Sequence, residues 1–333
     1  NGAYKLANHI VNEKIEFERN PLYWNDKETV INSATFLAIE NPSTDVARYR
    51  AGDLDMTNYA LPPEQFAKLQ KELPGEVFTT RTLATYSYEL NNKKAPFDNV
   101  NVRKALNLSL DRNVITDKVL GQGQTPTYVF TPTYIEEGHL IQQPAYSKEP
   151  MAQRNEEAIK LLEEAGYSKA NPLKFTILYN TNENHKKVAI AAASMWKANT
   201  KGLIDVKLEN QEWKTYIDSR RAGRYDAARA GWNADYNQAT TFGNYFLSNS
   251  SNNTAKYANP EYDKAIAESY VATDAEGRAK AYAKAEEILA KDFGIVPIFN
   301  YVNPRLVKPY VKGYSGKDPQ DHIYLRNLYI IKH

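Results

Sequence analysis

The stretch from Arg229 to Asp235 places two opposite charges six residues apart, with Gly231 between them. Arg229 offers a planar cation with five N–H donors, and Asp235 offers a carboxylate. Gly231 has no Cβ and lets another backbone come close. A ligand with an ammonium at one end and a carboxylate at the other, such as a free peptide, would match this polarity. An ion pair between Arg229 and Asp235 is an equally good interpretation of these residues alone.

The sequence shows no pattern typical of a catalytic or metal site. It has no cysteine, which excludes disulfides, thiolate metal sites and cysteine nucleophiles. No two of its histidines are three or four residues apart, so a helical metal site is not expected. Nucleophile-elbow, Walker A and dinucleotide-binding motifs are also missing. We therefore expect no enzyme activity and no cofactor. The histidines are His9, His139, His185, His322 and His333.

The composition is that of a water-soluble globular protein with about two domains. The chain has 333 residues, 42% of them hydrophobic and 25% charged. A net charge of +2 is too balanced for a nucleic-acid binder. No apolar run approaches the ~18 residues of a membrane span. Tyrosine is abundant, with 24 residues, and it suits adaptable binding surfaces as well as β structure.

The middle of the chain predicts an α/β unit. Apolar residues alternate over 173–179, 204–208 and 225–232, and helical patterns cover 187–199 and 213–221. This β-α-β-α-β order favours a sheet with a parallel component, in which ligands bind beyond the carboxyl ends of the strands.

Three chain segments should therefore meet at one crevice. They begin at Asn180, Asn210 and Gly231, each at the end of a predicted strand.

Local signals predict further elements. Asp45 is expected to cap a helix that ends near Gly52, and Asp111 to cap one that ends at Gly121. Residues 82–90 should form a strand with Tyr86 and Tyr88 on one face. Two helices at 262–270 and 275–291 precede a strand at 295–301. The tail from residue 302 resembles the opening section, which indicates that the chain returns to its first domain.

Several motifs together resemble the peptide-type solute-binding proteins of ABC importers. The family signature is matched by Pro96-Phe97, Val102–Leu106 and Leu110-Asp111-Arg112. Members that bind oligopeptides or murein peptides are matched along the whole chain. Their further matching stretches are Asn1–Tyr4, Tyr179–Thr181, His185–Lys187, Asn210–Thr215, Arg229–Trp232, Ala234–Asn237, Ser251–Thr254, Arg305–Pro309 and Tyr329–His333.

The resemblance implies an α/β, two-lobed fold of the periplasmic-binding-protein type II, peptide-binding class. Residues 1–83 and 303–333 would form a discontinuous part of the first lobe, and 84–302 a second large lobe. The protein would be a periplasmic monomer that binds peptides of about two to five residues through their backbone groups and delivers them to a membrane permease. The resemblance also implies that a signal peptide and a substantial N-terminal portion, which the family carries before the position of Asn1, are absent from this chain.

The resemblance also assigns roles to individual residues. Asp235 would bind the peptide ammonium, Arg229 the carboxylate of a tripeptide, and His185, through water, that of a shorter peptide. Waters in roomy side-chain pockets would accommodate different sequences. The remaining predicted ligand-binding residues are Gly231, Trp232 and Asn233 with backbone groups, and Asn180, Trp213, Arg220, Arg221, Asn252, Thr254 and Tyr301 around the pockets.

Four positions depart from the family pattern. Relatives carry a cysteine pair at the positions of Ala84 and Asn233. Leu120 stands where a lysine would meet the carboxylate of a longer peptide, which puts tetrapeptide binding in doubt. Arg221 replaces a histidine and adds positive charge beside a pocket.

Three alternatives stay open. A murein tripeptide binder of the same family would use the extra charge of Arg221. A hydrolase fragment is disfavoured by the lack of catalytic motifs. A structural or adhesive surface protein would show no ligand-dependent stabilisation.

Overall fold

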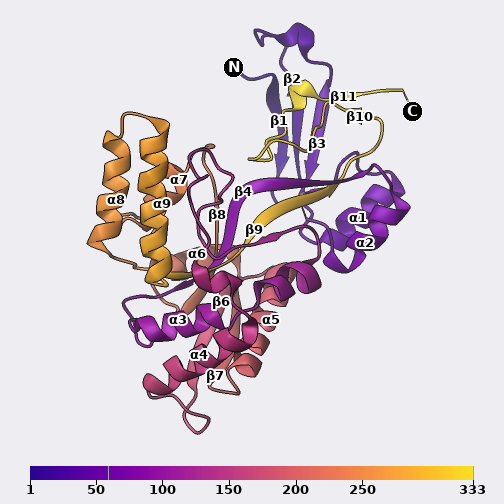
Figure 1. The fold of residues 1–333 in the computed structure, drawn as a ribbon. Helices are drawn as coiled ribbons and strands as arrows, with labels where there is room; N and C mark the ends of the chain where they lie inside the picture. The colour runs from indigo at the N-terminus through magenta and orange to yellow at the C-terminus, as the bar shows by residue number, and fades with distance from the viewer. Residues whose placement is uncertain (59, 333) are drawn as a thin grey trace. The chain divides into compact units, whose positions relative to one another are not determined.

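A computed structural model describes residues 1–58 and 60–332, which form two compact units. One unit comprises residues 1–82 and 302–333, and the other comprises 83–301 (Figure 1). The division predicted from the sequence lies one residue from these boundaries. The assignment of the two parts to receptor lobes stays a prediction, and His333 lies outside the described residues.

The first unit contains an antiparallel three-stranded sheet of order β1-β2-β3, a second strand pair and two helices. Tyr49 of α1, Leu69 of α2 and Leu306 pack in its core. The elements are β1 (Tyr4–Ile10), β2 (Lys14–Arg19), β3 (Ser33–Leu37), α1 (Pro42–Ala51), α2 (Pro63–Glu72), β10 (Val311–Lys312), β11 (Tyr329–Ile330) and 3-10 turns at Asp26–Glu28 and Leu325–Asn327.

The predicted cap of the first helix is wrong by four residues. Asn41 caps α1, because its side chain accepts hydrogen bonds from the backbone N–H groups of Ser43 and Thr44. Asp45 instead lies buried in the first turn and accepts from the backbone of Asn58. The predicted end is confirmed, since Gly52 has a left-handed backbone with φ of 89°.

The second unit is built on a six-stranded mixed sheet of order β5-β9-β4-β8-β6-β7. The predicted parallel component is confirmed, because β6 pairs in parallel with β7 and with β8. Next to β8 lies β4, which pairs with it antiparallel. The strands are β4 (Val77–Leu90), β5 (Thr125–Pro126), β6 (Leu173–Asn180), β7 (Ile204–Gln211), β8 (Ala227–Asn233) and β9 (Ile295–Leu306).

Helices cover both faces of this sheet. Alternate residues of β6, Phe175 and Ile177 among them, share a core with Trp196 of α5, whereas Leu178 packs with Tyr216 of α6. Strand alternation thus places α5 and α6 on opposite faces. The helices are α3 (Val100–Leu108), α4 (Met151–Glu164), α5 (Glu183–Asn199), α6 (Trp213–Arg221), α7 (Thr240–Gly243), α8 (Pro260–Val271) and α9 (Ala275–Lys291), with a π-helix at Val114–Leu120 and 3-10 turns at Ala145–Lys148 and Asn244–Phe246.

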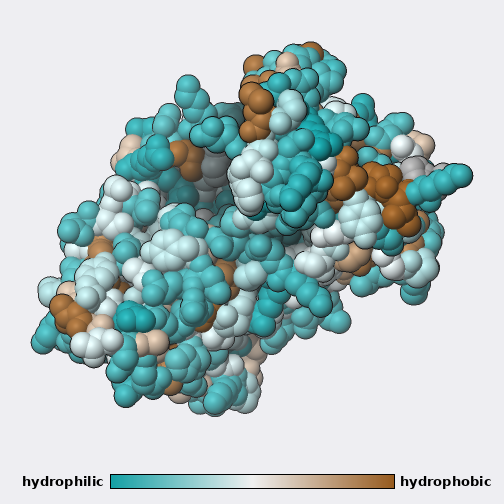
Figure 2. Space-filling view, turned by 90° about the horizontal axis from the view of Figure 1, so that it is seen from above, coloured by the Kyte–Doolittle hydropathy of each residue, from teal (hydrophilic) through white to brown (hydrophobic). Residues whose placement is uncertain are grey.

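The surface is largely polar. In Figure 2 the visible face is mostly hydrophilic, and apolar side chains occur in separate patches. Single exposed apolar side chains are ordinary for folded proteins. None of the helices in the described ranges has the length and apolar content that a membrane crossing requires.

Candidate functional site

Arg229 lies on β8 within a group of neutral side chains. Its Nη1 donates to Oδ1 of Asn180 at 3.4 Å, and its Nη2 donates to the hydroxyl of Tyr301. The guanidinium carbon lies 5.1 Å from the ring centroid of Tyr86, a cation–π contact. Two of the predicted site residues, Asn180 and Tyr301, are therefore brought to Arg229.

Among the described residues, no carboxylate neutralises this cation. Within residues 1–58 and 60–332, no ion pair joins Arg229 to Asp235 or to another acid, so the ion-pair interpretation is wrong. The Nε of Arg229 is buried without a hydrogen-bond partner. The residue as a whole is half-buried. A partly desolvated cation without a counter-charge is unfavourable, so the group is suited to receive an anionic ligand.

Gly231 makes room for this group. A Cβ on Gly231 would lie 3.0 Å from Nη2 of Arg229 and 3.0 Å from the Tyr301 hydroxyl oxygen. The missing side chain therefore accommodates two side chains of the protein itself. Because the guanidinium lies this close to Gly231, the side chain of Arg229 extends along the strand as far as the residue two positions after Arg229.

His185 approaches the same tyrosine from α5. Its ring centroid lies 5.5 Å from that of Tyr86. Burial and the positive charge of Arg229 hold the pKa of His185 well below its usual value of 6.5. The helix N-terminus acts in the same direction, because its partial positive charge disfavours a cation. His185 is thus a neutral hydrogen-bonding group beside Arg229.

This pKa predicts a loss of stability in mild acid. As the pH falls below about 6.5, the unfolded chain binds a proton that the folded chain excludes. Stability is therefore full above pH 6.5 and decreases below it. His185→Asn should remove about 1 kcal/mol of the decrease between pH 7.5 and 5.5, measured by urea unfolding. The exposed His9→Asn serves as the control, and an unchanged pH dependence in His185→Asn would contradict the assignment.

The opposite face of β4 and β8 carries a second charged group. Glu89, which is 1% exposed, accepts from Arg220 at 2.9 Å, from the Tyr245 hydroxyl at 2.5 Å and from the hydroxyl of Thr254. Burial alone would lower the pKa of Arg220, but the Glu89 carboxylate raises it well above the usual value. Arg220 and Thr254, two of the residues predicted to line pockets, are thereby brought together, and their role toward a ligand stays a prediction.

Glu89 is the main residue of the site that the sequence reasoning missed. Glu89 is the only charged residue in the strand predicted over residues 82–90. A charged residue is rarely buried without a partner, so a single charge inside such a strand could have indicated a buried ion pair.

Asp235 and Trp232 lie at the end of β8. Asp235 is exposed, two residues beyond the strand, and Trp232 packs edge-on against Tyr245 with ring centroids 4.8 Å apart. The ring of Tyr245 thus connects Trp232 to the Glu89 group. The predicted residues Asp235 and Arg229 come from one chain segment but have separate surroundings.

Four predicted residues are exposed, and no contact joins any two of them within the part of the chain that the structure describes. Trp213 is 55% exposed, and its ring lies beside that of Tyr216, tilted by 30° with the ring centroids 5.9 Å apart. The Tyr216 hydroxyl donates to the carbonyl oxygen of Arg229, so Trp213 is linked indirectly to the first group. The other three are Arg221, Asn233 and Asn252.

Leu120 belongs to the apolar core rather than to a surface. It is 4% exposed, at the end of the π-helix. The position therefore supplies neither a charge nor a hydrogen bond to a ligand.

Ala84 and Asn233 face each other directly in the β4–β8 ladder. The neighbouring Ala234 N–H donates to Leu83 at 2.8 Å, so Ala84 and Asn233 form a non-hydrogen-bonded pair, for which Cα atoms lie about 4.5 Å apart. That separation suits a disulfide.

We expect Ala84→Cys combined with Asn233→Cys to form a disulfide that raises the unfolding free energy by about 1–2 kcal/mol. Urea unfolding with and without reductant measures the gain, and each single variant is a control. Free thiols that persist in an oxidising buffer would contradict the pairing.

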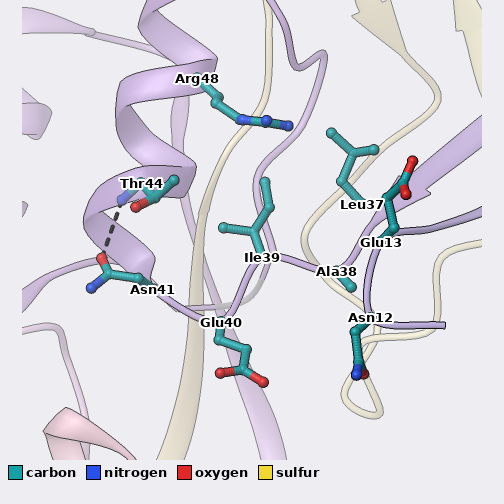
Figure 3. Close-up of a pocket in the computed structure, with 9 residues that line it drawn as sticks. All are labelled: Asn12, Glu13, Leu37, Ala38, Ile39, Glu40, Asn41, Thr44 and Arg48. Atoms are coloured by element: carbon teal, nitrogen blue, oxygen red, sulfur yellow. Dashed lines mark hydrogen bonds between the residues drawn. The ribbon is translucent and has the colours of Figure 1, made fainter.

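An open pocket of about 530 Å³ lies in the first unit (Figure 3). It contains none of the predicted ligand-binding residues, so it is not the candidate site. No group of three metal-ligating side chains occurs within the described ranges. The pocket is lined by Asn12, Glu13, Leu37, Ala38, Ile39, Glu40, Asn41, Thr44 and Arg48.

Comparison with known proteins identifies relatives along the whole chain. The model of the bacterial extracellular solute-binding proteins, family 5 Middle, matches residues 1–254. The chain is 96% identical over 333 residues to the periplasmic oligopeptide-binding protein OppA of Haemophilus influenzae, and it covers 62% of that protein. It is 44% identical over 333 residues to the periplasmic murein peptide-binding protein MppA of Escherichia coli, of which it covers 61%.

A solved structure also resembles this fold. The crystal structure of Haemophilus influenzae OppA in complex with RPPGFSPFR matches with a TM-score of 0.95 and 95% identity. The match covers all of this chain and 65% of the solved chain. The chain thus spans about three fifths of the length of the curated relatives it matches.

Proposed function

Because the chain belongs to the bacterial extracellular solute-binding proteins of family 5, we propose that it binds peptides for an ABC importer. In this proposal the 333 residues are the larger lobe and part of the first lobe of a periplasmic, monomeric receptor. The receptor holds a peptide without cleaving it and delivers it to a membrane permease. The relatives are binding proteins for oligopeptides and murein peptides, which supports this choice.

One observation carries the proposal: the cation of Arg229, half-buried and with its Nε fully buried, lacks an acidic partner within the described residues and precedes the exposed Asp235. The guanidinium is level with Gly231, four residues before Asp235, which is at most about 13 Å along an extended chain. An extended tripeptide spans about 10 Å, and a charge-assisted hydrogen bond at each end adds about 3 Å. The ligand thus needs about 16 Å, about 3 Å more than the backbone spans, and the side chain of Asp235 would cover this difference.

The two ends of a peptide would therefore have separate partners. Asp235 would accept from the ammonium, and Arg229 would donate to the carboxylate, with His185 as a neutral donor nearby. Backbone groups around Asn233 would pair with the extended ligand, which makes binding independent of its side chains. The group of Glu89, Arg220 and Thr254 would form the wall of a side-chain pocket.

Calorimetry of the full-length protein with trialanine tests this function. We expect one peptide per protein, and mass spectrometry should recover the peptide intact after prolonged incubation. Blocking both peptide ends, by acetylation and amidation, should weaken binding strongly. A lack of binding would refute the proposal, and cleavage would favour the hydrolase alternative.

Peptide length provides a further prediction. Because Leu120 supplies no charge, the carboxylate of a tetrapeptide lacks the partner that Arg229 gives to a tripeptide. We expect trialanine to bind more tightly than tetraalanine, by about 1 kcal/mol or more, in parallel titrations. The reverse order would contradict this role of Leu120. The nine-residue peptide named for the OppA complex shows that a relative accepts long ligands, so the proposal sets no upper limit at five residues.

A murein tripeptide is the second candidate, favoured by the exposed Arg221 beside Arg220 and by the similarity to MppA. Murein tripeptide carries additional charged groups that Arg221 could bind. A competition assay between murein tripeptide and trilysine distinguishes the two candidate functions. Tighter binding of murein tripeptide would require the contact between its additional charged groups and Arg221.

A further inference from the structure

Thr241 occupies a buried position between two predicted ligand-binding residues. It is 4% exposed and lies in the short helix α7. Its hydroxyl oxygen accepts from Nε1 of Trp232 at 3.3 Å and from the backbone N–H of Asp235 at 3.2 Å. The same hydroxyl donates to Oδ2 of Asp235 at 3.3 Å.

These contacts use the full hydrogen-bonding capacity of the hydroxyl. A threonine hydroxyl has one hydrogen and two lone pairs. Both lone pairs receive N–H donors, and the hydrogen goes to the carboxylate. The hydroxyl cannot rotate without losing a bond, so it holds the orientation of Asp235. Oδ1 of Asp235 has no donor among the described residues and is left for a ligand.

The helix that carries Thr241 is itself fixed by packing. Phe242 is fully buried with its ring centroid 5.2 Å from that of Phe130. A Cβ on Gly243 would lie only 2.7 Å from Ile266, so α7 lies directly against α8. Thr241 therefore has a fixed position from which to orient the exposed Asp235. Within the described residues, no other side chain donates a hydrogen bond to the Asp235 carboxylate.

We propose that Thr241 is a positioning residue for the amino end of the ligand. It aims the Asp235 carboxylate at the ligand ammonium and holds the Trp232 indole beside it. This inference rests on the proposed function. Pre-orienting the acceptor removes the cost of ordering it when the ligand binds.

The test compares peptides with and without an ammonium in the full-length protein. Thr241→Val has nearly the same shape but lacks the hydroxyl. We expect it to weaken trialanine binding about tenfold, the effect of losing a hydrogen bond to a charged group. Binding of N-acetyl-trialanine, which lacks the ammonium, should change less than about twofold. Thr241→Ser keeps the hydroxyl and should bind both peptides like the natural protein.

Thr240→Val is the matched control. Thr240 precedes Thr241 in the same helix, but its hydroxyl bonds to Gln238 and Tyr282 instead of Asp235. This variant should leave both affinities unchanged. If Thr241→Val fails to fold, Thr241→Ala removes the same hydroxyl without adding a methyl group.

The outcomes are distinguishable. Equal weakening of both peptides would show a merely structural role, and unchanged trialanine binding would show no role; either overturns the inference. Failure of the natural protein to bind trialanine would overturn the proposed function and this inference with it.

Discussion

Asp235→Ala in the full-length protein should weaken tripeptide binding by about 1.5–3 kcal/mol, that is, about 10- to 150-fold. In the proposed site, the substitution removes the carboxylate that would bind the peptide ammonium. Because Asp235 is exposed, we expect the variant to fold like the natural protein. Isothermal titration calorimetry with trialanine measures the change.

Glu163→Ala is the matched control for Asp235. It removes one negative charge from an exposed position on α4, outside the groups around Arg229 and Glu89. We expect trialanine to bind this variant like the natural protein. If Asp235→Ala also leaves the affinity unchanged, the ammonium is bound elsewhere and the proposed orientation of the peptide is wrong.

Glu89→Ala should reduce the free energy of unfolding by about 3–5 kcal/mol. The change leaves the cation of Arg220 buried without its acid and removes an acceptor from Tyr245 and Thr254. Removing one partner of a buried ion pair costs far more than the pair contributes, because the remaining charge stays desolvated. Urea unfolding monitored by tryptophan fluorescence provides the measurement.

An exposed ion pair gives the comparison for Glu89. Glu287 and Lys291 pair at 2.6 Å on α9, where their side chains are 63% and 72% exposed. Glu287→Ala should cost at most about 1 kcal/mol, as solvent screens such pairs. Replacing Glu89 by Leu together with Arg220 by Met should recover much of the loss. A loss in Glu89→Ala no larger than that in Glu287→Ala would rule out a strong buried pair.

Local patterns predicted many elements closely. The helix expected at 275–291 agrees with α9 to the residue, because its polar and apolar positions repeat with the helical period and Asp274 caps it. Asp111 accepts from the backbone N–H groups of Asn113 and Val114, as its predicted capping role requires. The cap of α1 was misplaced because Asn41 and Asp45 both carry suitable side chains, and Pro42 at the first helical position favours the earlier start.

The candidate site was predictable only in part. The parallel strands could be inferred from the strand–helix order, and this correctly brought Asn180 close to Arg229. The family resemblance supplied Tyr301 and Thr254, which lie far along the chain from their partners. Neither route identified Glu89 or Thr241. The lone charge of Glu89 within its strand could have indicated a buried pair but not its partners, and a single hydroxyl such as that of Thr241 has no sequence pattern that distinguishes a site from a surface.

The sequence by itself determined the strand and helix periods, the missing cysteine chemistry and the opposite charges of Arg229 and Asp235. These properties depend on residue type and on neighbours within a few positions. The tertiary structure decided which charges meet: Glu89 pairs with Arg220, 131 residues away, whereas Arg229 is held by neutral groups on the other face of the sheet. The register of β4 against β8 causes this separation, because adjacent residues in a strand point to opposite faces and only the pairing of distant strands sets which side chains share a face.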